Sequence, residues 1–320
     1  MPVRNFVKDD VEKIVAIINS RCRPKGRYFA EITEEIFNQK VLSCPYFKQE
    51  GFFVYERSGR IIGFALCTYR PKSESQIAIY AKSAFLPLFY LSPRLRKRDV
   101  AMALLDHVEK YVKECGKDEI WTHYIAPCSI YLGIYRNHRH LAEALMEHGF
   151  EVNQDYPEEG YFHNNLKRYR IPWDVEKAIE KLKDEGVNFS VVDTDKRIAD
   201  LLFVNGKYGW YESFKRKPKR EGRKYLIAEQ DGSLIAYCGF STRPFRGIPL
   251  EGGGWGPILV DKKHRRRGIG TALVALSLDY MKRLGLTDAY LSTGAFNHYS
   301  YRRLGFRLIA AFKIMRKKLS

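Results

Sequence analysis

The sequence lacks the features that would place this chain in a membrane. Its 320 residues contain no run of about 18 apolar residues, which excludes a transmembrane helix. The first residues, MPVRNFVKDDVEKIV, carry acidic side chains where a signal peptide requires a positive region followed by an apolar run. We therefore expect a cytoplasmic protein that makes no contact with a membrane.

Cysteine is scarce, and its spacing excludes a zinc site of the finger type. The six cysteines form no CxxC pair, and no His/Cys cluster has metal-ligand spacing. Most lie in apolar segments, so we expect small core residues, with a catalytic thiol as the lesser alternative. We expect no metal and no disulfide framework. The cysteines are Cys22, Cys44, Cys67, Cys115, Cys128 and Cys238.

Acidic residues are too few to balance the basic ones, and the formal net charge is +18. Residues 171–320 hold 29 Lys and Arg against 16 Asp and Glu, a balance of +13, whereas residues 1–170 hold 26 against 21, a balance of +5. This excess favours an anionic ligand in the second half, such as a nucleotide-bearing cofactor, an acidic substrate or a nucleic acid. A solvated basic surface is the alternative.

The second half has the pattern of an α/β unit. Asp231-Gly232 predicts a hairpin turn between two apolar strands, and an amphipathic segment with apolar residues at helical spacing follows a basic loop. Gly305 is typical of the end of a short helix. We predict strands at 224–229, 233–240, 256–260, 289–292 and 306–313, and helices at 268–284 and 298–304.

The first half repeats this order, which indicates a duplicated domain. The spacing between aligned residues changes only in segments that we expect to be loops. We expect domains at residues 1–170 and 188–320, joined by a linker helix within residues 171–187. The aligned pairs are Glu56 with Glu229, Arg96 with Arg265, Gly116 with Gly285 and Gly149 with Gly305.

The segment KKHRRRGIGTA, residues 262–272, carries the strongest local signal. It lies between a predicted strand and a predicted helix, where free backbone N–H groups and the helix dipole favour an anion. Gly268 and Gly270 allow the chain to approach a phosphate closely. The alternative is a basic turn that merely precedes a helix.

Two motifs of the second half resemble the GNAT superfamily of coenzyme A-dependent N-acyltransferases. RRRGIG, residues 265–270, resembles the pyrophosphate signature R/Q-x-x-G-x-G/A, and YRRLGF, residues 301–306, resembles the Y-x-x-x-G-F ending of a later motif. The resemblance covers residues 188–320 well and residues 1–170 in order and pattern only. It implies an α/β (α+β) fold of two tandem GNAT-like domains, each a mixed, mostly antiparallel sheet flanked by helices, as in mycothiol synthase-like double GNAT proteins.

The resemblance also implies the chemistry. Acetyl-CoA would be the co-substrate, with its pyrophosphate on the loop and its pantetheine arm beside the end of the strand. One backbone N–H would polarise the thioester carbonyl, and Tyr301 would protonate the leaving thiolate unless it is only a core residue. The implied cofactor-binding residues are Ile258, Leu259, Val260, Arg265, Arg266, Arg267, Gly268, Ile269, Gly270, Thr271 and Asn297.

The general base and one coenzyme contact are less defined. Glu251 precedes the strand that enters the site, where some family members have their base, although a solvated loop residue is the alternative. His298 and a water chain are weaker candidates. Asn297 is a candidate coenzyme contact, but the family's frequent asparagine lies seven residues before the tyrosine, where this chain has Gly294.

The first half lacks the corresponding residues. The alignment pairs Gly268 with Asp99, a carboxylate that would repel a phosphate, and Tyr301 with Leu145. We interpret residues 1–170 as a degenerate copy that supports the second domain or shapes the acceptor cleft. Binding of a different ligand is the alternative.

The acceptor is expected near residues 206–224, GKYGWYESFKRKPKREGRK, where aromatic and basic residues alternate. This segment suits an acidic small molecule or peptide, single-stranded RNA, or no partner at all. We favour an N-acetyltransferase that acts on a primary amine of a small molecule or peptide by direct attack. An RNA-binding or RNA-modifying protein and a non-catalytic acyl-CoA-binding protein are the alternatives. The predicted acceptor wall consists of the aromatic residues Tyr208, Trp210, Tyr211 and Phe214 and of a basic run, Lys215, Arg216, Lys217, Lys219 and Arg220.

Overall fold

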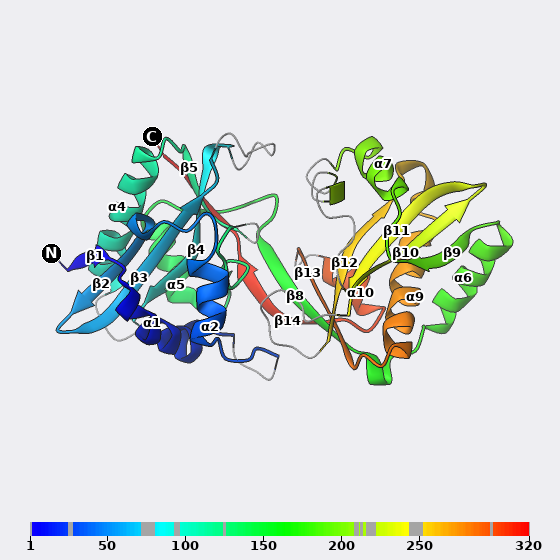
Figure 1. Ribbon diagram of the computed structural model, residues 1–320, viewed down its shortest axis with the longest axis horizontal. Helices are drawn as coiled ribbons and strands as arrows, with labels where there is room; N and C mark the ends of the chain where they lie inside the picture. The colour runs from blue at the N-terminus through cyan, green and yellow to red at the C-terminus, as the bar shows by residue number, and fades with distance from the viewer. Residues whose placement is uncertain are drawn as a thin grey trace. The chain divides into compact units, whose positions relative to one another are not determined.

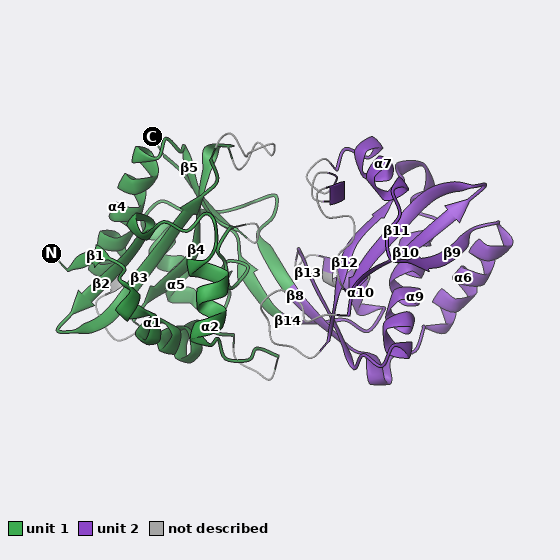
Figure 2. Ribbon diagram, in the orientation of Figure 1, with its two compact units in different colours: residues 1–160, 310–320 green, residues 161–309 purple. Residues whose placement is uncertain are grey.

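The chain forms two compact units in a computed structural model (Figures 1 and 2). Unit 1 comprises residues 1–160 and 310–320, and unit 2 comprises residues 161–309. The structure describes residues 2–24, 28–71, 81–92, 97–123, 126–207, 211, 214–215, 222–242, 252–294 and 297–319. Within these ranges every helix is too short or too polar to span a bilayer.

Unit 1 is built on a seven-stranded sheet of order β1-β2-β3-β4-β5-β15-β7. Its neighbours are antiparallel except β4 and β5, which run parallel. The strands are β1 (Val3–Asn5), β2 (Phe52–Arg57), β3 (Arg60–Tyr69), β4 (Ser83–Leu91), β5 (Glu119–Thr122), β6 (Ile134–Tyr135), β7 (Glu151–Val152) and β15 (Met315–Lys318). The helices are η1 (Lys8–Asp10), α1 (Val11–Ile17), η2 (Ile18–Cys22), α2 (Glu34–Phe37), η3 (Asn38–Leu42), η4 (Gln49–Gly51), α4 (Lys97–Glu114) and α5 (Arg139–Glu147).

Unit 2 is built on a sheet in which β14, β8, β13, β12, β11, β10 and β9 follow one another. β12 and β13 run parallel, whereas β9, β10, β11 and β12 pair antiparallel. The strands are β8 (Glu158–Asn165), β9 (Asn188–Val192), β10 (Arg223–Gln230), β11 (Ser233–Ser241), β12 (Gly253–Val260), β13 (Asp288–Gly294) and β14 (Arg307–Lys313). The helices are η6 (Leu166–Arg168), α6 (Trp173–Asp184), α7 (Arg197–Val204), η7 (Lys262–His264), α9 (Ile269–Arg283) and α10 (His298–Arg302).

Alternation along the strands of unit 2 places two apolar faces on opposite sides of its sheet. Leu226 and Cys238 pack in one core with α6 and α9, whereas Ile227 and Tyr237 pack in another with α7. β12, the strand that leads into residues 262–272, therefore packs on both faces of the sheet, through Trp255 in the first core and Leu259 in the second. The mixed, mostly antiparallel sheets flanked by helices confirm the predicted fold class.

The division into units differs from the boundaries that we expected. Two strands carry the chain between the units, because the boundaries fall after Gly160 in β8 and after Ile309 in β14. The expected linker helix is α6, whose buried Val175, Ile179 and Leu182 belong to the core of unit 2. This amphipathic charged helix therefore packs against α9.

The last residues of the chain complete the sheet of unit 1, which the expected domain 188–320 did not foresee. β15 lies between β5 and β7 and pairs with both. Met315 is fully buried in the core of unit 1. A strand that fills an open edge of a sheet hides backbone groups that would otherwise attract other chains.

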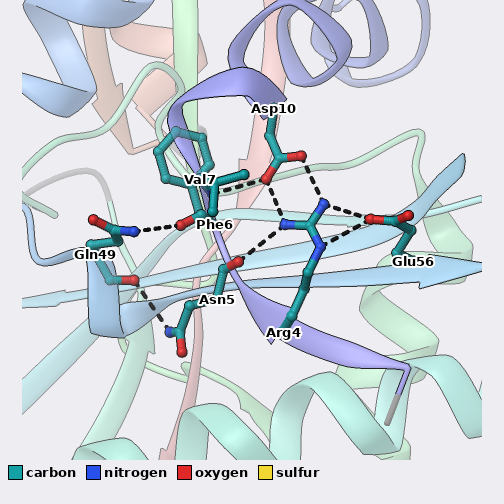
Figure 3. A network of polar contacts seen from close by, with 7 residues as sticks. All are labelled: Arg4, Asn5, Phe6, Val7, Asp10, Gln49 and Glu56. Atoms are coloured by element: carbon teal, nitrogen blue, oxygen red, sulfur yellow. Dashed lines mark hydrogen bonds and ion pairs between the residues drawn. The ribbon is translucent and has the colours of Figure 1, made fainter. Parts of the chain in front are cut away.

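A bidentate arginine ties the first strand of unit 1 to its hairpin (Figure 3). Arg4 Nη1 and Nη2 donate to the two carboxylate oxygens of Asp10 at 2.7 and 2.8 Å, and Arg4 Nε donates to Glu56 Oε2 at 2.9 Å. In unit 2, Glu229 also accepts an arginine, because Arg197 pairs with Asp195 and with Glu229. Glu56 and Glu229 are one of the aligned pairs of the sequence repeat, but Arg4 lies on β1 whereas Arg197 begins α7, so only the glutamate position is common to both units.

We expect Arg4→Met to lower the free energy of unfolding by about 2 kcal/mol at pH 7, because Asp10 is only 2% exposed and would lose its charged partner. Burial alone would raise the pKa of Asp10, but the hydrogen bonds from Arg4 and Val7 lower it below its usual range. The contribution is therefore present above about pH 4 and is lost as the pH falls through the folded pKa. Denaturant unfolding at pH 7 and pH 3 measures it, with the exposed Arg60→Met as control.

One cysteine pair corrects the expectation that most of the cysteines are small core residues and that the chain has no disulfide framework. Cys44 and Cys128 form a disulfide across 84 residues of sequence, with their Cα atoms 5.4 Å apart. Cys67 and Cys238 are buried as expected. Cysteine spacing did not reveal the bond, because its partners come from segments that only the tertiary fold brings together.

Candidate functional site

Residues 261–268 join β12 to α9 and are called the anion loop below. The loop has the glycine-dependent backbone shape that the sequence predicted. β12 ends at Val260, η7 follows, and α9 begins at Ile269 with Gly268 as its N-cap. Gly268 has φ +87° and Arg266 has φ +62°, both in the left-handed region. Glycine takes this conformation without strain, and nothing lies within 4 Å of the position that a Cβ at Gly268 would occupy.

The loop presents unused donors at the start of α9. The first bond that closes on the cap runs from Ala272 N–H to Gly268 O at 2.9 Å. Within the described part of the chain, the backbone N–H groups of residues 266–271 donate no hydrogen bond to a backbone oxygen of this loop. A pocket of about 240 Å³ opens beside them, lined by Val260, His264, Arg265, Arg266, Gly268, Ile269, Gly270 and Thr271. Donors and dipole together suit an anion with several oxygens, such as a pyrophosphate.

The three arginines of the motif do not share one environment. Arg265 and Arg266 line the pocket, and Arg265 Nε also donates to Val260 O at 3.1 Å. Arg267 does not line it, and its guanidinium instead bonds to Gln230 and Glu185. Two of the three side chains predicted to meet the anion are thus placed at the pocket.

The strand that leads into the loop separates from its parallel neighbour. β12 pairs with β13 only at Gly253 and Gly254, whereas its antiparallel pairing with β11 continues to Val260. A bulge at Gly256 and Pro257 interrupts that second ladder. Beyond Gly254, the β13 side of β12 has no strand partner in the described chain.

The predicted pantetheine residues lie on this open stretch. Ile258 and Val260 are half-buried, whereas the Leu259 side chain is 5% exposed and packs with the α7 core. Leu259 can therefore offer only its backbone to a ligand. Open strand edges bind extended ligands through main-chain hydrogen bonds.

Tyr301 lies on α10 in an aromatic cage. Its ring centroid is 5.6 Å from Trp255 in an edge-to-face arrangement, 5.9 Å from Phe306 and 6.3 Å from Phe162. Burial raises the pKa of Tyr301 to about 12, with a smaller contribution from Cys238. The phenol is therefore protonated throughout the neutral range, as a proton donor must be.

Trp255 is the residue of this site that the sequence motifs did not single out. It lies on β12, it is 5% exposed, and its Nε1 donates to Ser277 Oγ at 2.7 Å. Ser277 Oγ donates in turn to Val274 O at 2.8 Å. The tryptophan thus ties β12 to α9 while its ring supports Tyr301. Its only signal in the sequence was a large aromatic residue within a run of glycines.

Of the three remaining candidates, Asn297, Glu251 and His298, the structure describes only Asn297 with its side chain. Asn297 caps α10, and its Nδ2 donates to Thr293 Oγ1 at 3.0 Å, so it ties α10 to β13. Glu251 lies outside the described residues. His298 belongs to α10, but its side chain is likewise outside the described set.

Part of the predicted acceptor wall can be located. The ring of Tyr211 lies tilted beside that of Phe203 with 5.3 Å between ring centroids, and the Lys215 ammonium lies 5.0 Å from the centroid of the Tyr211 ring. Phe214 is buried against Tyr225. These aromatic contacts group part of the segment beside α7. Tyr208, Trp210, Arg216, Lys217, Lys219 and Arg220 lie outside the described residues.

The described part of the equivalent region of unit 1 differs from unit 2 in burial and in residue type. Every residue of β4 is buried, whereas β12 has half-buried positions between Gly256 and Val260. Leu145, the counterpart of Tyr301, is fully buried on α5. Asp99, the counterpart of Gly268, lies in the first turn of α4. Unit 1 thus has neither a tyrosine nor a glycine at the positions that align with Tyr301 and Gly268.

A histidine of unit 1 should make stability depend on pH. Burial lowers the pKa of His123 to about 4, and its ring lies near those of Trp121 and Tyr156. Between about pH 6.5 and 4 the unfolded chain binds a proton that the folded chain does not. The unfolding free energy should therefore fall by about 2 kcal/mol as the pH drops through this window. Denaturant titrations of the parent and His123→Gln test this, and an equal slope in both would exclude His123 as the cause.

Two segments of the chain match the same protein family. The Acetyltransferase (GNAT) family matches the chain twice, at residues 15–128 and 196–306. YhbS of Escherichia coli strain K12, an uncharacterized N-acetyltransferase, is 35% identical over 86 residues, which cover 27% of this chain and 50% of that protein. The chain thus spans about half the length of the curated relatives it matches.

Solved structures show the same fold along the whole chain. A fungal GCN5-related glucosamine N-acetyltransferase region within a multi-domain GH3 beta-N-acetylglucosaminidase aligns with a TM-score of 0.72 at 17% identity, covering 98% of this chain and 38% of the other. A tandem GNAT protein from the clavulanic acid biosynthesis pathway aligns with a TM-score of 0.61 at 16% identity, covering 99% and 98%. With a family match in each unit, the chain belongs to the acetyltransferase (GNAT) family as a tandem GNAT protein.

Proposed function

We propose that this chain transfers an acetyl group from acetyl-CoA to a primary amine of a small molecule or peptide, with its active site in unit 2. The observation that carries the proposal is the β12–α9 loop. It combines unused N–H groups, a left-handed glycine cap and a pocket with two arginines. Acetyl-CoA supplies an activated thioester when bound.

The residues of unit 2 fit this co-substrate. The N–H groups of residues 266–271 would hold the pyrophosphate, and the open side of β12 would pair with the pantetheine arm. Arg265 and Arg266 would add positive charge beside the phosphates. A β12 N–H that faces the thioester oxygen would stabilise the charge that develops there. Asn297 remains a proposed coenzyme contact.

Tyr301 and a base would move the protons. A neutral amine attacks the carbonyl carbon, a C–N bond forms, and the C–S bond breaks. The phenol of Tyr301 would give its proton to the departing sulfur, and the amine would lose one of its protons. We propose that Glu251 accepts this proton, because it precedes the strand that enters the site in the sequence. Proton exchange with solvent would then restore both side chains.

Unit 1 is proposed to bind no coenzyme. The buried β4, the carboxylate of Asp99 and the apolar Leu145 support this reading. Its role would be to support unit 2 or to shape the acceptor site.

Calorimetric titration with acetyl-CoA tests both proposals at once, and we expect one site per chain. Mass spectrometry of amine libraries incubated with the protein and acetyl-CoA would then identify an acceptor by a gain of one acetyl group. Two sites per chain would contradict the silent unit 1. An absence of binding would contradict the acetyltransferase proposal, and salt-sensitive retention on RNA would then favour the nucleic-acid alternative.

A further inference from the structure

A closed ring of hydrogen bonds adjoins the anion loop, and the proposed reaction does not use it. Arg267 Nη2 donates to Glu185 Oε2 at 2.8 Å, and Arg267 Nη1 donates to Gln230 Oε1 at 2.9 Å. Gln230 Nε2 donates to the backbone oxygen of Glu185 at 2.8 Å. The ring joins the end of α6, the turn between β10 and β11, and the loop before α9.

Arg267 occupies the position where the loop is conformationally most demanding. It stands between Arg266 and Gly268, which both have positive φ. A residue other than glycine rarely adopts the left-handed region, and it persists there where its surroundings hold it. The planar fork of an arginine can hold two acceptors in fixed directions. Arg267 also contacts His264 Nδ1 at 3.0 Å, which fixes the turn from the other side.

We propose that Glu185, acting through Arg267 and Gln230, is a positioning residue that holds the β12–α9 loop in its anion-binding shape. This inference rests on the proposed function of the loop. Arg267 then serves as a scaffold for the phosphate donors, whereas Arg265 and Arg266 line the pocket itself.

The direction in which removal of the Glu185 carboxylate changes the affinity for an anion separates a positioning role from a purely electrostatic one. Glu185 is a carboxylate near a site for anions, so its removal should strengthen anion binding if only charge matters. If Glu185 holds the loop in shape, its removal should weaken binding despite the gain in positive potential. Asp184 is the adjacent exposed carboxylate, so Asp184→Ala removes the same charge without touching the ring.

The experiment compares the parent, Glu185→Ala, Asp184→Ala and Arg267→Lys by two measurements. The first is the initial rate of tryptic cleavage after Arg265 and Arg266 without ligand, which reports opening of the loop. The second is the Kd of acetyl-CoA by calorimetry. Glu185→Ala should be cleaved about fivefold faster and bind acetyl-CoA about fivefold more weakly, because Arg267 loses the carboxylate that holds its guanidinium. Arg267→Lys should behave similarly, because a lysine cannot bridge both acceptors.

Asp184→Ala should match the parent in cleavage and bind equally well or slightly better. Cleavage of Glu185→Ala at the parent rate, or tighter binding of acetyl-CoA by that variant, would overturn the positioning role. If the parent itself binds no acetyl-CoA, the proposed function fails, and the cleavage rates still decide whether Glu185 holds the loop.

Discussion

Gly268→Asp should weaken acetyl-CoA binding by more than about 100-fold. The residue caps α9 and faces the pocket of the anion loop. A carboxylate about 5 Å from a phosphate charge costs roughly 3 kcal/mol at an effective dielectric near 20, which corresponds to a factor above about 100. The substitution also copies Asp99, the counterpart in unit 1. Calorimetry with acetyl-CoA measures the loss directly.

Gly268→Asn is the matched control. Asn and Asp have nearly the same size, both tolerate the left-handed region better than most residues, and nothing lies within 4 Å of the added Cβ. The Asn variant should therefore lose less than about tenfold in affinity, so that the difference between the two variants isolates the charge. Equal losses in both would mean that backbone strain, and not repulsion of a phosphate, governs the site.

The elements around this site were predictable because their signals are local. The hairpin turn at Asp231-Gly232, the glycine cap of α9 and the Gly305 helix end each depend on a few neighbouring residues. The strand and helix limits therefore agree with the sequence to within a few residues. The family resemblance is confirmed for the same reason, since its motifs lie on one strand, one loop and two helices.

The remaining features depend on contacts between distant segments. The place of β15 between β5 and β7 follows from open sheet edges that no local pattern reveals. The disulfide joins Cys44 to Cys128, and the ring around Arg267 joins it to Glu185, 82 residues away. A charge motif shows that arginines are present, but their partners decide which of them can meet a ligand.

Tyr301→Phe should lower kcat by about 100-fold or more and leave the Kd of acetyl-CoA nearly unchanged, since a positioned acid contributes about 10² to 10⁴ in rate. The phenyl ring keeps the contacts with Trp255, Phe306 and Phe162, so the cage should stay intact. Release of free coenzyme A, followed with a thiol reagent, measures the rate with any acceptor found in the screen. Tyr299→Phe, on the exposed side of the same helix, is the control and should retain the parent rate.

The pH profile gives the sharper test of this role. Because the pKa of Tyr301 is raised to about 12, the phenol stays protonated across the assay range, and any rise in rate with pH must come from another group. The ratio of the parent rate to the Tyr301→Phe rate should therefore stay nearly constant across the assay range, because residue 301 titrates there in neither protein. If kcat of Tyr301→Phe equals that of the parent at every pH, solvent protonates the thiolate. Tyr301 would then only pack against Trp255, Phe306 and Phe162.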